Sequence, residues 1–486
     1  MNEDNVMLIQ AKRSVNKAAD TIQECLTSYA CALKYNDLPP EVTHAAKVRT
    51  IDNLGVLIGG FFGEPCHIVR NLAAQMPNTD GATVIGTRMK TTPDLAAFVN
   101  ATTARYMEMN DHYHWPKSFD GHPSDVVTPI LATAEHVHAS GRDFIIGIVL
   151  AYEVFCRICD NFHNQGFDNT NFACLATAVA AAKLMELSPD QLAHCISMAV
   201  VPNNILRQVR KDYMSMFKPA ASGHAGRAGV FAAMLARAGM EGPHLPFEGN
   251  AGWCEHVARE RFSLTTLGGE NTPFKILDSR MKMRPAAAHD ISSILAAEKV
   301  VPALGNIDNV KHVTVEVNKK VKTMNGTGEH RWNPDSRENA KTSSPYLVAA
   351  TLMDGTVTLR SFNDTHLWSP KLRALMQKIE VVENKEFTEV FERLPVVECA
   401  QVTVMTYTGE RLVGQTDGNK DNQATPKSNA QIEEKFRGLT EDVLGVKRVN
   451  TILDRLWHLE ELQNVAEIPS ALVVEVIANT TKNLIS

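Results

Sequence analysis

Ionisable side chains crowd into one short stretch of the chain and offer the groups that acid–base chemistry needs. Glutamate, aspartate and histidine occur there together, at Glu108, Asp111, His112, His114, Asp120, His122 and Asp125. The stretch then changes abruptly into an apolar, helix-forming segment, Val126 to Val137. Charged groups packed beside a helix start are costly unless they are solvated or used. We therefore predict that this stretch forms part of an active site, with Asp125 as a cap of the following helix.

The composition is typical of a globular protein and argues against several classes of partner. A chain of 486 residues is too long for one ordinary core, so we expect two or three domains. The hydrophobic fraction of 44% and the charged fraction of 21% are ordinary. A net charge of −6 without a long basic run makes nucleic acid an improbable partner. No uncharged apolar stretch reaches about 18 residues, so no membrane span is predicted.

Cysteine usage and the first residues indicate a cytoplasmic location. The nine cysteines are odd in number and scattered from Cys25 to Cys399, which is typical of free thiols in a reducing compartment. Cys156 and Cys159 share one face of a predicted helix, and we interpret them as packing residues rather than metal ligands. The polar N-terminal segment, residues 1–15, lacks the apolar core of a secretory signal.

The first half of the chain is predicted to be helical throughout. Apolar residues recur at helical spacing in Val42–Gly60, Asp94–Met107, Val126–His138, Phe144–Cys159, Ala173–Met185, Pro189–Val200 and Gly223–Ala238. Alanine is abundant in the later segments, and small side chains let helices approach closely. These features predict a tightly packed helical body that holds the ionisable stretch.

A change of pattern near Pro273 predicts a second, smaller domain. Val310–Val317 alternates apolar and polar residues and is rich in β-branched side chains, as a strand requires. Thr356–Ser361 and Ala400–Thr406 have similar patterns, and helical segments lie at His289–Val300, Ser344–Met353 and Ser369–Met376. We therefore expect a mainly α protein with a large all-helical domain and a smaller inserted α+β lid domain.

The predicted domain boundaries follow from these changes in pattern. The first part of the helical domain covers residues 1–272, and the lid domain covers residues 273–413. A polar loop, Gly414 to Ser428, opens the last part, residues 414–486. Asn429–Leu484 is helical again and is predicted to return to the helical domain, because it has little core of its own.

Several short motifs, taken in order along the chain, resemble those of the MmgE/PrpD family. They are AKVRTIDNLGVLIGGF at residues 46–61, Asn110-Asp111 followed by Gly121-His122-Pro123-Ser124-Asp125, Lys218-Pro219 with Gly223-His224-Ala225-Gly226-Arg227, Trp332-Asn333-Pro334 with Arg337-Glu338, Ser344-Pro345-Tyr346, Asp354-Gly355 and Lys435-Phe436-Arg437. Each motif is weak alone, but their joint order and separation make the resemblance strong. The family includes 2-methylcitrate dehydratases, cis-aconitate decarboxylases and an iminodisuccinate epimerase.

The resemblance implies an architecture and a class of reaction. Its members have a helical domain and an α+β domain that closes over the active site, and they are typically homodimers. They use no metal or organic cofactor, and the chain shows no local metal-ligand spacing. Known members act on small polycarboxylates or an imine diacid. Removing a proton beside a carboxylate requires a base with a pKa near neutrality and fixed cations for the developing charge.

The resemblance assigns catalytic roles to residues on both sides of Pro273. His122 matches the family's His-Pro position and is the predicted base, with Glu108 and Asp111 tuning or sharing its role. Lys218, at the start of an Ala/Gly-rich helix, is predicted to bind a substrate carboxylate, although a surface lysine is the alternative. Tyr346 is predicted to donate to a carboxylate or leaving hydroxyl; its alternative is a packed aromatic at the domain interface.

Further positions are predicted to bind substrate. Arg207 and Arg210, one turn apart, can form a fork for a carboxylate or, alternatively, a surface ion-pair network. Lys282 matches a family Lys-x-x-Pro, and His289 has the spacing of the dehydratase branch, or begins the next helix. His112 stands where the family commonly has Thr, and Glu108 where it commonly has Asp.

The resemblance favours dehydration of 2-methylcitrate or a similar hydroxy-tricarboxylate. Decarboxylases usually have histidine at the position of Asp168, which is otherwise an ordinary turn residue. The Gly121–Asp125 motif and the position of His289 also match the dehydratase branch. Epimerisation of an imine diacid, decarboxylation of cis-aconitate, and polycarboxylate binding without catalysis are the alternatives, since Glu108, His112 and Lys341 depart from the family pattern.

Overall fold

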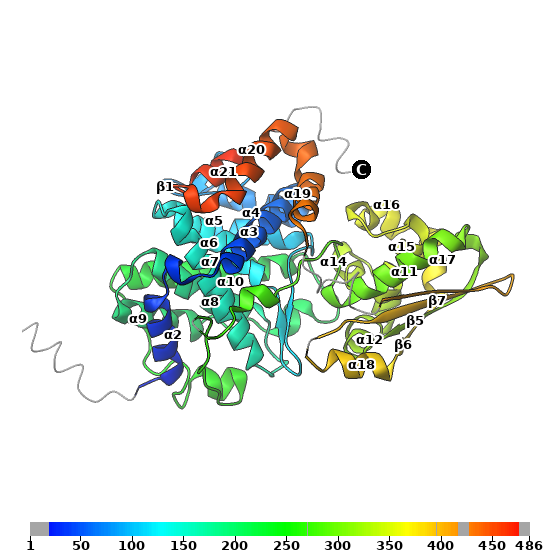
Figure 1. Cartoon of the computed structure of the whole chain (residues 1–486), viewed down its shortest axis with the longest axis horizontal. Coiled ribbons are helices and arrows are strands. Elements are labelled where there is room, and N and C mark those ends of the chain that lie inside the picture. The colour runs from blue at the N-terminus through cyan, green and yellow to red at the C-terminus, as the bar shows by residue number, and fades with distance from the viewer. Residues whose placement is uncertain (1–18, 270, 395, 417–426, 476–486) are drawn as a thin grey trace, which may run out of the picture.

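The structure, a computed structural model, describes residues 19–475 apart from residues 270, 395 and 417–426. The chain is mainly α-helical, as predicted. Figure 1 shows a larger helical body on the left and a smaller body with the main sheet on the right. The predictions for residues 1–15, for most of the polar loop and for the end of the C-terminal tail lie outside the described residues.

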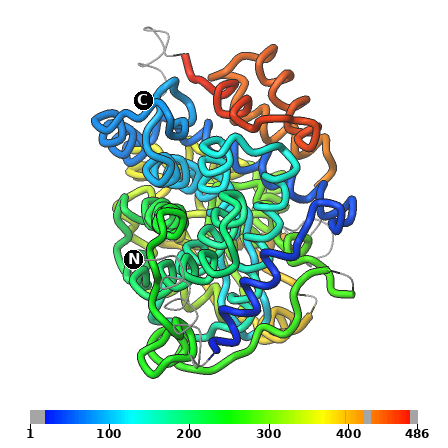
Figure 2. The backbone as a smooth tube through the Cα atoms, turned by 90° about the vertical axis from the view of Figure 1, so that its left-hand side faces the viewer, coloured from blue at the N-terminus to red at the C-terminus, as the bar shows by residue number. Residues whose placement is uncertain are grey.

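The larger body is built from helices of both ends of the chain. They are α2 (Thr21–Ala32), α3 (Pro40–Gly60), α4 (Glu64–Ala73), α5 (Pro93–Tyr106), α6 (Val127–His136), α7 (Gly141–Asp160), α8 (Thr170–Leu184), α9 (Pro189–Val200), α10 (Phe217–Arg237), α19 (Asn429–Leu444), α20 (Val446–Trp457) and α21 (Glu467–Ala471). α19 and α20 pack against α3, and Figures 1 and 2 show the orange and red C-terminal helices at the upper edge of this body. One apolar cluster therefore joins Ile22 to Leu456.

Short elements connect these helices and carry part of the ionisable stretch. They are β1 (Pro77–Thr83) with β2 (Lys90–Thr91), β3 (Tyr113–His114) with β4 (Asp120–Gly121), and the turns η1 (Tyr35–Asp37), η2 (Pro123–Val126), η3 (Arg207–Arg210), η4 (Cys254–Ala258), η5 (Lys275–Asp278) and η9 (Leu459–Glu461). β3 pairs antiparallel with β4, so His114 lies opposite Asp120. This hairpin folds the stretch back on itself and brings its histidines together.

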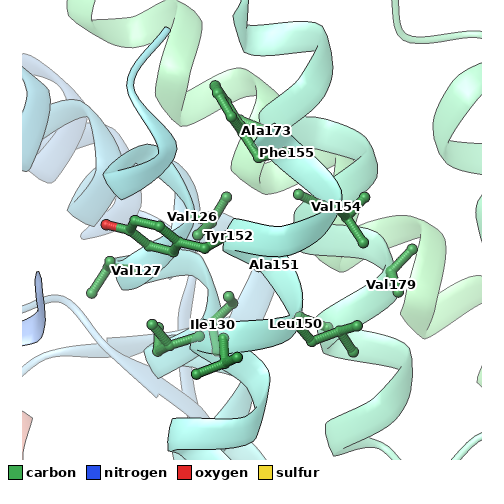
Figure 3. Close-up of a cluster of buried hydrophobic side chains, with 14 of the residues drawn as sticks. Val126, Val127, Ile130, Leu150, Ala151, Tyr152, Val154, Phe155, Ala173 and Val179 are labelled. Carbon is green, nitrogen blue, oxygen red and sulfur yellow. The ribbon is translucent and has the colours of Figure 1, made fainter. Parts of the chain in front are cut away.

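The buried helix α7 connects the core to the ionisable stretch. It is buried along nearly its whole length and packs against α8; Figure 3 shows Leu150 and Val154 of α7 on the side where Val179 of α8 lies. Tyr152 lies among them, but its hydroxyl leaves the apolar cluster and donates to Asp111 Oδ2 at 2.9 Å. The buried helix α7 thus fixes the segment that precedes the hairpin through Tyr152 and Asp111.

Helix α10 packs closely on its neighbours because glycine replaces side chains along its contact faces. A Cβ atom at Gly229 would lie 2.6 Å from the carbonyl oxygen of Cys174 and 2.8 Å from Thr177 Cβ, both on α8. Those atoms belong to a buried helix and have little room to move. The close packing fixes the N-terminal turn of α10, which carries Lys218.

We expect Gly229→Ala to destabilise the protein by about 1–3 kcal/mol, because the added methyl overpacks the α8–α10 contact. The matched control is Gly438→Ala in α19, where a Cβ meets nothing within 4 Å. That change is expected to stabilise by about 0.4–1 kcal/mol through the unfolded chain. Urea unfolding of both variants measures the difference, and equal midpoints would contradict the packing argument.

The smaller body consists of a sheet covered by helices. The sheet has the order β6 (Ile379–Glu383), β5 (Val310–Val317), β7 (Ala400–Thr406) and β8 (Arg411–Thr416), with β5 and β6 parallel and the other pairs antiparallel. The remaining elements are α11 (Ile291–Leu304), α12 (Lys319–Asn325), α13 (Glu329–Trp332), α14 (Arg337–Ala340), α15 (Ser344–Asp354), α16 (Asp364–Leu367), α17 (Pro370–Met376), α18 (Lys385–Phe391), η6 (Ala288–Asp290), η7 (Ile307–Asn309) and η8 (Leu359–Phe362). α11 packs on β7 and β8.

The strand predictions have a mixed outcome. Val310–Val317 and Ala400–Thr406 are strands with the predicted bounds. Thr356–Ser361 is not a strand: Leu359–Phe362 forms the turn η8, in which Thr358 and Ser361 cap each other. Local hydrogen bonds of these hydroxyl side chains outcompete strand pairing there.

A second apolar cluster runs from Ala286 to Leu412 and includes the inner faces of β5 and β7. Phe274, Ile276 and Met281 pack instead into the cluster of the larger body. We propose a domain boundary between Met281 and Ala286, and an end of the smaller domain after β8. In the part of the chain that the structure describes, no helix is long and apolar enough to cross a membrane.

Candidate active site

A cavity of about 260 Å³ has walls from both bodies. The larger body contributes Arg105, Glu108, His112, Phe119, Asp120, His122, Asp168, Asn169, Arg207, Arg210, Lys211, Asp212, Met214 and Lys218, and the smaller body contributes Ala287, Ala288, His289, Thr323, Met324, Asn325, Thr327, His330, Arg331 and Thr342. The volume lies near the lower end of small-molecule sites, which span about 300–1,000 Å³. Arginine and lysine outnumber the carboxylates in this lining, so the cavity suits a small anion.

Glu108 lies at the centre of a buried group of cations. α5 ends at Tyr106, and Glu108 follows with a backbone φ of +57°, a conformation that is uncommon for a side chain of this kind. Its carboxylate lies 3.0 Å from Arg105 Nη1, 2.9 Å from Lys218 Nζ and 3.4 Å from Lys282 Nζ. The unusual backbone thus turns one carboxylate toward several positive charges.

The charge state of Glu108 follows from these neighbours. Burial alone would raise the pKa of its carboxyl, but the charges of Arg105, Lys218 and Lys282 hold that pKa well below its ordinary value. A carboxylate so strongly paired is a poor proton acceptor. The structure therefore favours Glu108 as an organiser of cations over the shared base that the sequence suggested.

Lys282 supports Glu108 from behind rather than facing the cavity. Its side chain is fully buried, and its Nζ donates to the carbonyl oxygens of Glu108 and Ala286 as well as approaching the Glu108 carboxylate. Burial lowers the pKa of this amine to about 7, against the opposing charge of Glu108. Lys282 does not line the cavity, so the geometry does not support direct contact with substrate.

His122 has one ring nitrogen fixed and the other free for chemistry. Nδ1 donates to the carbonyl oxygen of Asp111 at 2.7 Å, which requires the proton on Nδ1 and leaves a lone pair on Nε2. Nε2 lies 3.8 Å from Glu108 Oε1. Burial, with the charges of Arg105 and Lys282, lowers the pKa of the imidazole well below its ordinary value. The histidine is thus neutral and has the tautomer of a base.

Asp111 holds His122 in place instead of reaching the cavity. Its Oδ1 accepts from the backbone N–H of Ser124 at 3.0 Å, and its Oδ2 accepts from Tyr152. The side chain is fully buried and does not line the cavity. We therefore interpret Asp111 as a positioning residue, since its carbonyl fixes the ring and its carboxylate fixes the turn η2.

Tyr346 lies away from the cavity. Its hydroxyl donates to the carbonyl oxygen of Ser361 and lies 3.1 Å from His366 Nδ1, inside the smaller body. The aromatic ring belongs to the apolar cluster of that body. A substrate donor needs a hydroxyl at the cavity wall, so this geometry does not support the role predicted for Tyr346; helix α15 turns the side chain inward.

The predicted carboxylate-binding residues Lys218, Arg207 and Arg210 all line the cavity. Arg207 contacts Gln165 and lies over the Phe119 ring at 4.8 Å. Arg210 Nε is 2.7 Å from Asp168 Oδ2, and this ion pair is part of the reason that the pKa of Asp168 stays below its ordinary value despite burial. Asp168 thus orients an arginine instead of serving as a turn residue alone.

A second group of ionisable residues, His112, Asp120 and His289, also lines the cavity. Asp120 Oδ2 lies 3.6 Å from His112 Nε2 and 3.3 Å from His289 Nε2. The ring of His114 stacks on Phe391 and does not line the cavity. Burial lowers the pKa of His112; for His289 the hydrogen bonds to Asp120 and Glu398 outweigh burial and raise the pKa.

Several cavity residues were given no role by the sequence. Arg105 stands three positions before Glu108 at the end of a predicted helix, a spacing that could have suggested their ion pair. Arg331 comes from α13, donates to Thr342 at 2.7 Å and has no comparable sequence signal.

Lys341, the charged departure from the family pattern, does not line the cavity. Its side chain is buried and donates to the carbonyl oxygen of Tyr106 at 2.7 Å.

Comparisons with known proteins agree in family along nearly the whole chain. The MmgE/PrpD N-terminal domain matches residues 24–264 and the MmgE/PrpD C-terminal domain matches residues 285–459. The chain is 25% identical to cis-aconitate decarboxylase of Homo sapiens over 476 residues, covering 93% of this chain and 94% of that protein. It is 26% identical over 369 residues to the mitochondrial 2-methylcitrate dehydratase of Yarrowia lipolytica (71% and 69% covered) and 27% identical over 336 residues to the 2-methylcitrate dehydratase of Salmonella typhimurium (64% and 67% covered).

Proposed function

The chain belongs to the MmgE/PrpD family, and we propose from this and from the cavity that it is a lyase for a small hydroxy-tricarboxylate. The leading reaction is dehydration of 2-methylcitrate or a close analogue. The observation that carries the proposal is the free Nε2 of a neutral His122 at the wall of a cavity lined by Lys218, Arg207 and Arg210.

The residues divide into a base and a set of anion-binding groups. Arg207, Arg210 and Lys218 bind substrate carboxylates, because guanidinium and ammonium groups pair with them directly. One bound carboxylate then lies beside the carbon that loses its proton. As His122 Nε2 takes that proton, negative charge moves onto the carboxylate and is stabilised by the same fixed cations. Glu108 holds Lys218 and Asp168 holds Arg210 in place before the reaction.

The elimination is completed without any change in oxidation state. The C–H electron pair forms the double bond, the C–O bond breaks, and the hydroxyl leaves as water with the proton that His122 has taken up. Glu108 Oε1, 3.8 Å from His122 Nε2, stabilises the imidazolium that forms. The His112–Asp120–His289 wall lies in the same cavity and is the side from which we propose that the hydroxyl departs.

Closure of the cavity is proposed to depend on the smaller body acting as a lid. His289, Arg331 and Thr342 of that body line the cavity together with His122 and Lys218 of the larger body. Separation of the two bodies would open the site, and contact between them would exclude water and strengthen the ion pairs.

Decarboxylation of cis-aconitate is the second candidate, because the match to a cis-aconitate decarboxylase extends over nearly the full length of both chains. The same cations would stabilise the carbanion left by carbon dioxide, and a protonated His122 would supply the proton. Asp168, which holds Arg210 in this chain, occupies a position where the resemblance to the family implies histidine in decarboxylases, and so supports dehydration.

The purified protein is expected to convert 2-methylcitrate to a product with a new conjugated double bond, seen as rising ultraviolet absorbance. Citrate, which lacks the methyl group, serves as the matched substrate and tests the fit of the cavity. Cis-aconitate with detection of carbon dioxide tests the second candidate. Absence of turnover with 2-methylcitrate, citrate and cis-aconitate would contradict a tricarboxylate lyase.

A homodimer in the cytoplasm completes the proposal. None of the nine cysteines, all of which lie within the described residues, forms a disulfide, which fits a reducing compartment. Light scattering of the purified protein measures the mass of the assembly, and a monomer would contradict the dimer. Fluorescent tagging in the source cell would test the location.

A further inference from the structure

We propose that His112, Asp120 and His289 form a binding site for one divalent transition-metal ion, such as Zn²⁺, at the cavity wall. The residues come from three places: the segment before β3, the strand β4 and the turn η6. One ligand atom of each lies within 4.8 Å of the others. Two imidazoles and one carboxylate are the ligands that zinc and iron prefer in sites with open positions.

The spacing of the ligand atoms suits a metal ion. Asp120 Oδ2 lies 3.6 Å from His112 Nε2 and 3.3 Å from His289 Nε2. Zinc binds nitrogen and oxygen at about 2.0–2.2 Å, so neighbouring ligand atoms of a tetrahedral site lie roughly 3.3 Å apart. The two rings are nearly perpendicular, at 87° with centroids 5.0 Å apart. Small side-chain rotations would therefore complete the coordination.

The ring of His112 is buried without a hydrogen-bond partner among the described residues. The residue is 1% exposed, and both of its ring nitrogens lack a partner there. A buried polar group without a partner costs free energy that a native structure rarely leaves uncompensated. A metal ion bound through Nε2, the nitrogen that faces Asp120 at 3.6 Å, would give that nitrogen its partner. By the resemblance described above, His112 also stands where the family commonly has Thr.

Outer residues orient the proposed ligands. Glu398 Oε1 lies 3.6 Å from His289 Nδ1 and would hold the proton on that nitrogen, while Nε2, which faces Asp120 at 3.3 Å, would give up its proton to bind the ion. Lys320 Nζ binds Asp120 Oδ1 at 2.8 Å and leaves Oδ2 for the ion. Carboxylate–histidine–metal arrangements of this kind are common around metal sites, because they fix the tautomer and the ring direction.

The charge around the site fits a cation that is shared with an anionic substrate. Asp120 and Glu398 carry negative charge, while Lys320 and Arg280 are paired with them. The positive charge of a divalent ion would thus remain mostly uncompensated by protein. A polycarboxylate in the cavity would balance it with a carboxylate or hydroxyl oxygen in an open coordination position. Binding of a substrate oxygen by the ion rests on the proposed function, whereas the metal site itself rests only on the geometry of the three ligands.

Metal binding is tested directly on the full-length protein after chelation and dialysis. Calorimetry with Zn²⁺ is expected to show one equivalent bound, and Co²⁺ is expected to give visible d–d absorption. His112→Ala and His289→Ala should each abolish both signals, and Glu398→Gln should weaken binding by about 10- to 100-fold. His330→Ala is the matched control, because His330 lines the same cavity away from the cluster and its loss should leave binding unchanged.

The outcomes separate the metal site from the proposed reaction. Zn²⁺ binding that depends on His112 and His289 supports the site, even if no tricarboxylate is turned over. Failure of the chelated full-length protein to bind either Zn²⁺ or Co²⁺ would overturn the metal site, and full turnover by that protein would leave the lyase standing. Binding that survives both histidine substitutions would also overturn it, because the ion would then lie elsewhere.

Discussion

Replacing His122 with alanine is expected to lower kcat for the tricarboxylate by about 10²–10⁴-fold, the contribution usual for a general base. The reason is the single free lone pair on Nε2, which the hydrogen bond from Nδ1 to the Asp111 carbonyl directs toward Glu108 and the cavity. The anion-binding residues are untouched, so KM should change far less than kcat. Steady-state kinetics on the purified variant measures both.

His122→Asn separates the proton transfer from the structural role of the ring. The asparagine amide can still donate to the Asp111 carbonyl in place of Nδ1, but it supplies no base at the position of Nε2. We expect thermal unfolding close to that of the wild type, with turnover as low as in the alanine variant. Wild-type turnover in either variant would show that another group removes the proton.

In the main sheet, the sequence predicted the strands in which apolar and polar residues alternate as buried and exposed positions do. β7 alternates throughout, and β5 alternates from Val313 onward, after a shift in register between Val310 and His312, because one face of each strand is buried and the other is partly exposed. β6 was missed since it has only five residues. β8 was missed because Gly414 replaces an apolar residue; a Cβ there would clash with the Ala296 carbonyl of α11.

The sequence predicted the site residues that lie close together along the chain, but it did not predict which side chains point into the cavity. Glu108 and His122 belong to one stretch, and their motif drew attention to both. Whether a side chain faces the cavity depends on tertiary packing: Lys282 and Tyr346 match the family pattern, yet both point into buried surroundings. Sequence spacing carries no information on such directions.

The histidine–aspartate cluster shows the same limit for contacts between distant residues. His112 and His289 are separated by more than a third of the chain, so no spacing rule could place them on one aspartate. The antiparallel bridge between His112 and Arg280 provides the connection. It brings the segment that leads to His289 beside the hairpin that carries Asp120.

Replacing Glu108 with glutamine is expected to destabilise the fold by about 3–5 kcal/mol, the cost of leaving buried charges without their counterion. Arg105, Lys218 and Lys282 all lie within 3.4 Å of this carboxylate. Glutamine has nearly the same shape, so the change tests charge rather than packing. Urea unfolding measures the loss, and a difference below about 1 kcal/mol would mean that the cations are balanced by other groups or solvent.

Adding Lys282→Met to Glu108→Gln removes one of the cations that the first substitution leaves without a counterion, and it should recover part of the lost stability. The single variant Lys282→Met completes the double-mutant cycle.

The loss of stability caused by Glu108→Gln should also depend on pH. Burial already lowers the pKa of Lys282 to about 7, and loss of the carboxylate lowers the folded-state pKa further, while the unfolded value stays near about 10.4. Below about pH 7, Lys282 is therefore protonated in the folded wild type, whereas protonating the same buried amine in the folded variant costs more free energy. The destabilisation should be larger near about pH 5.5 than near about pH 8.5; a cost that is equal at both would show that Lys282 does not respond to the charge of Glu108.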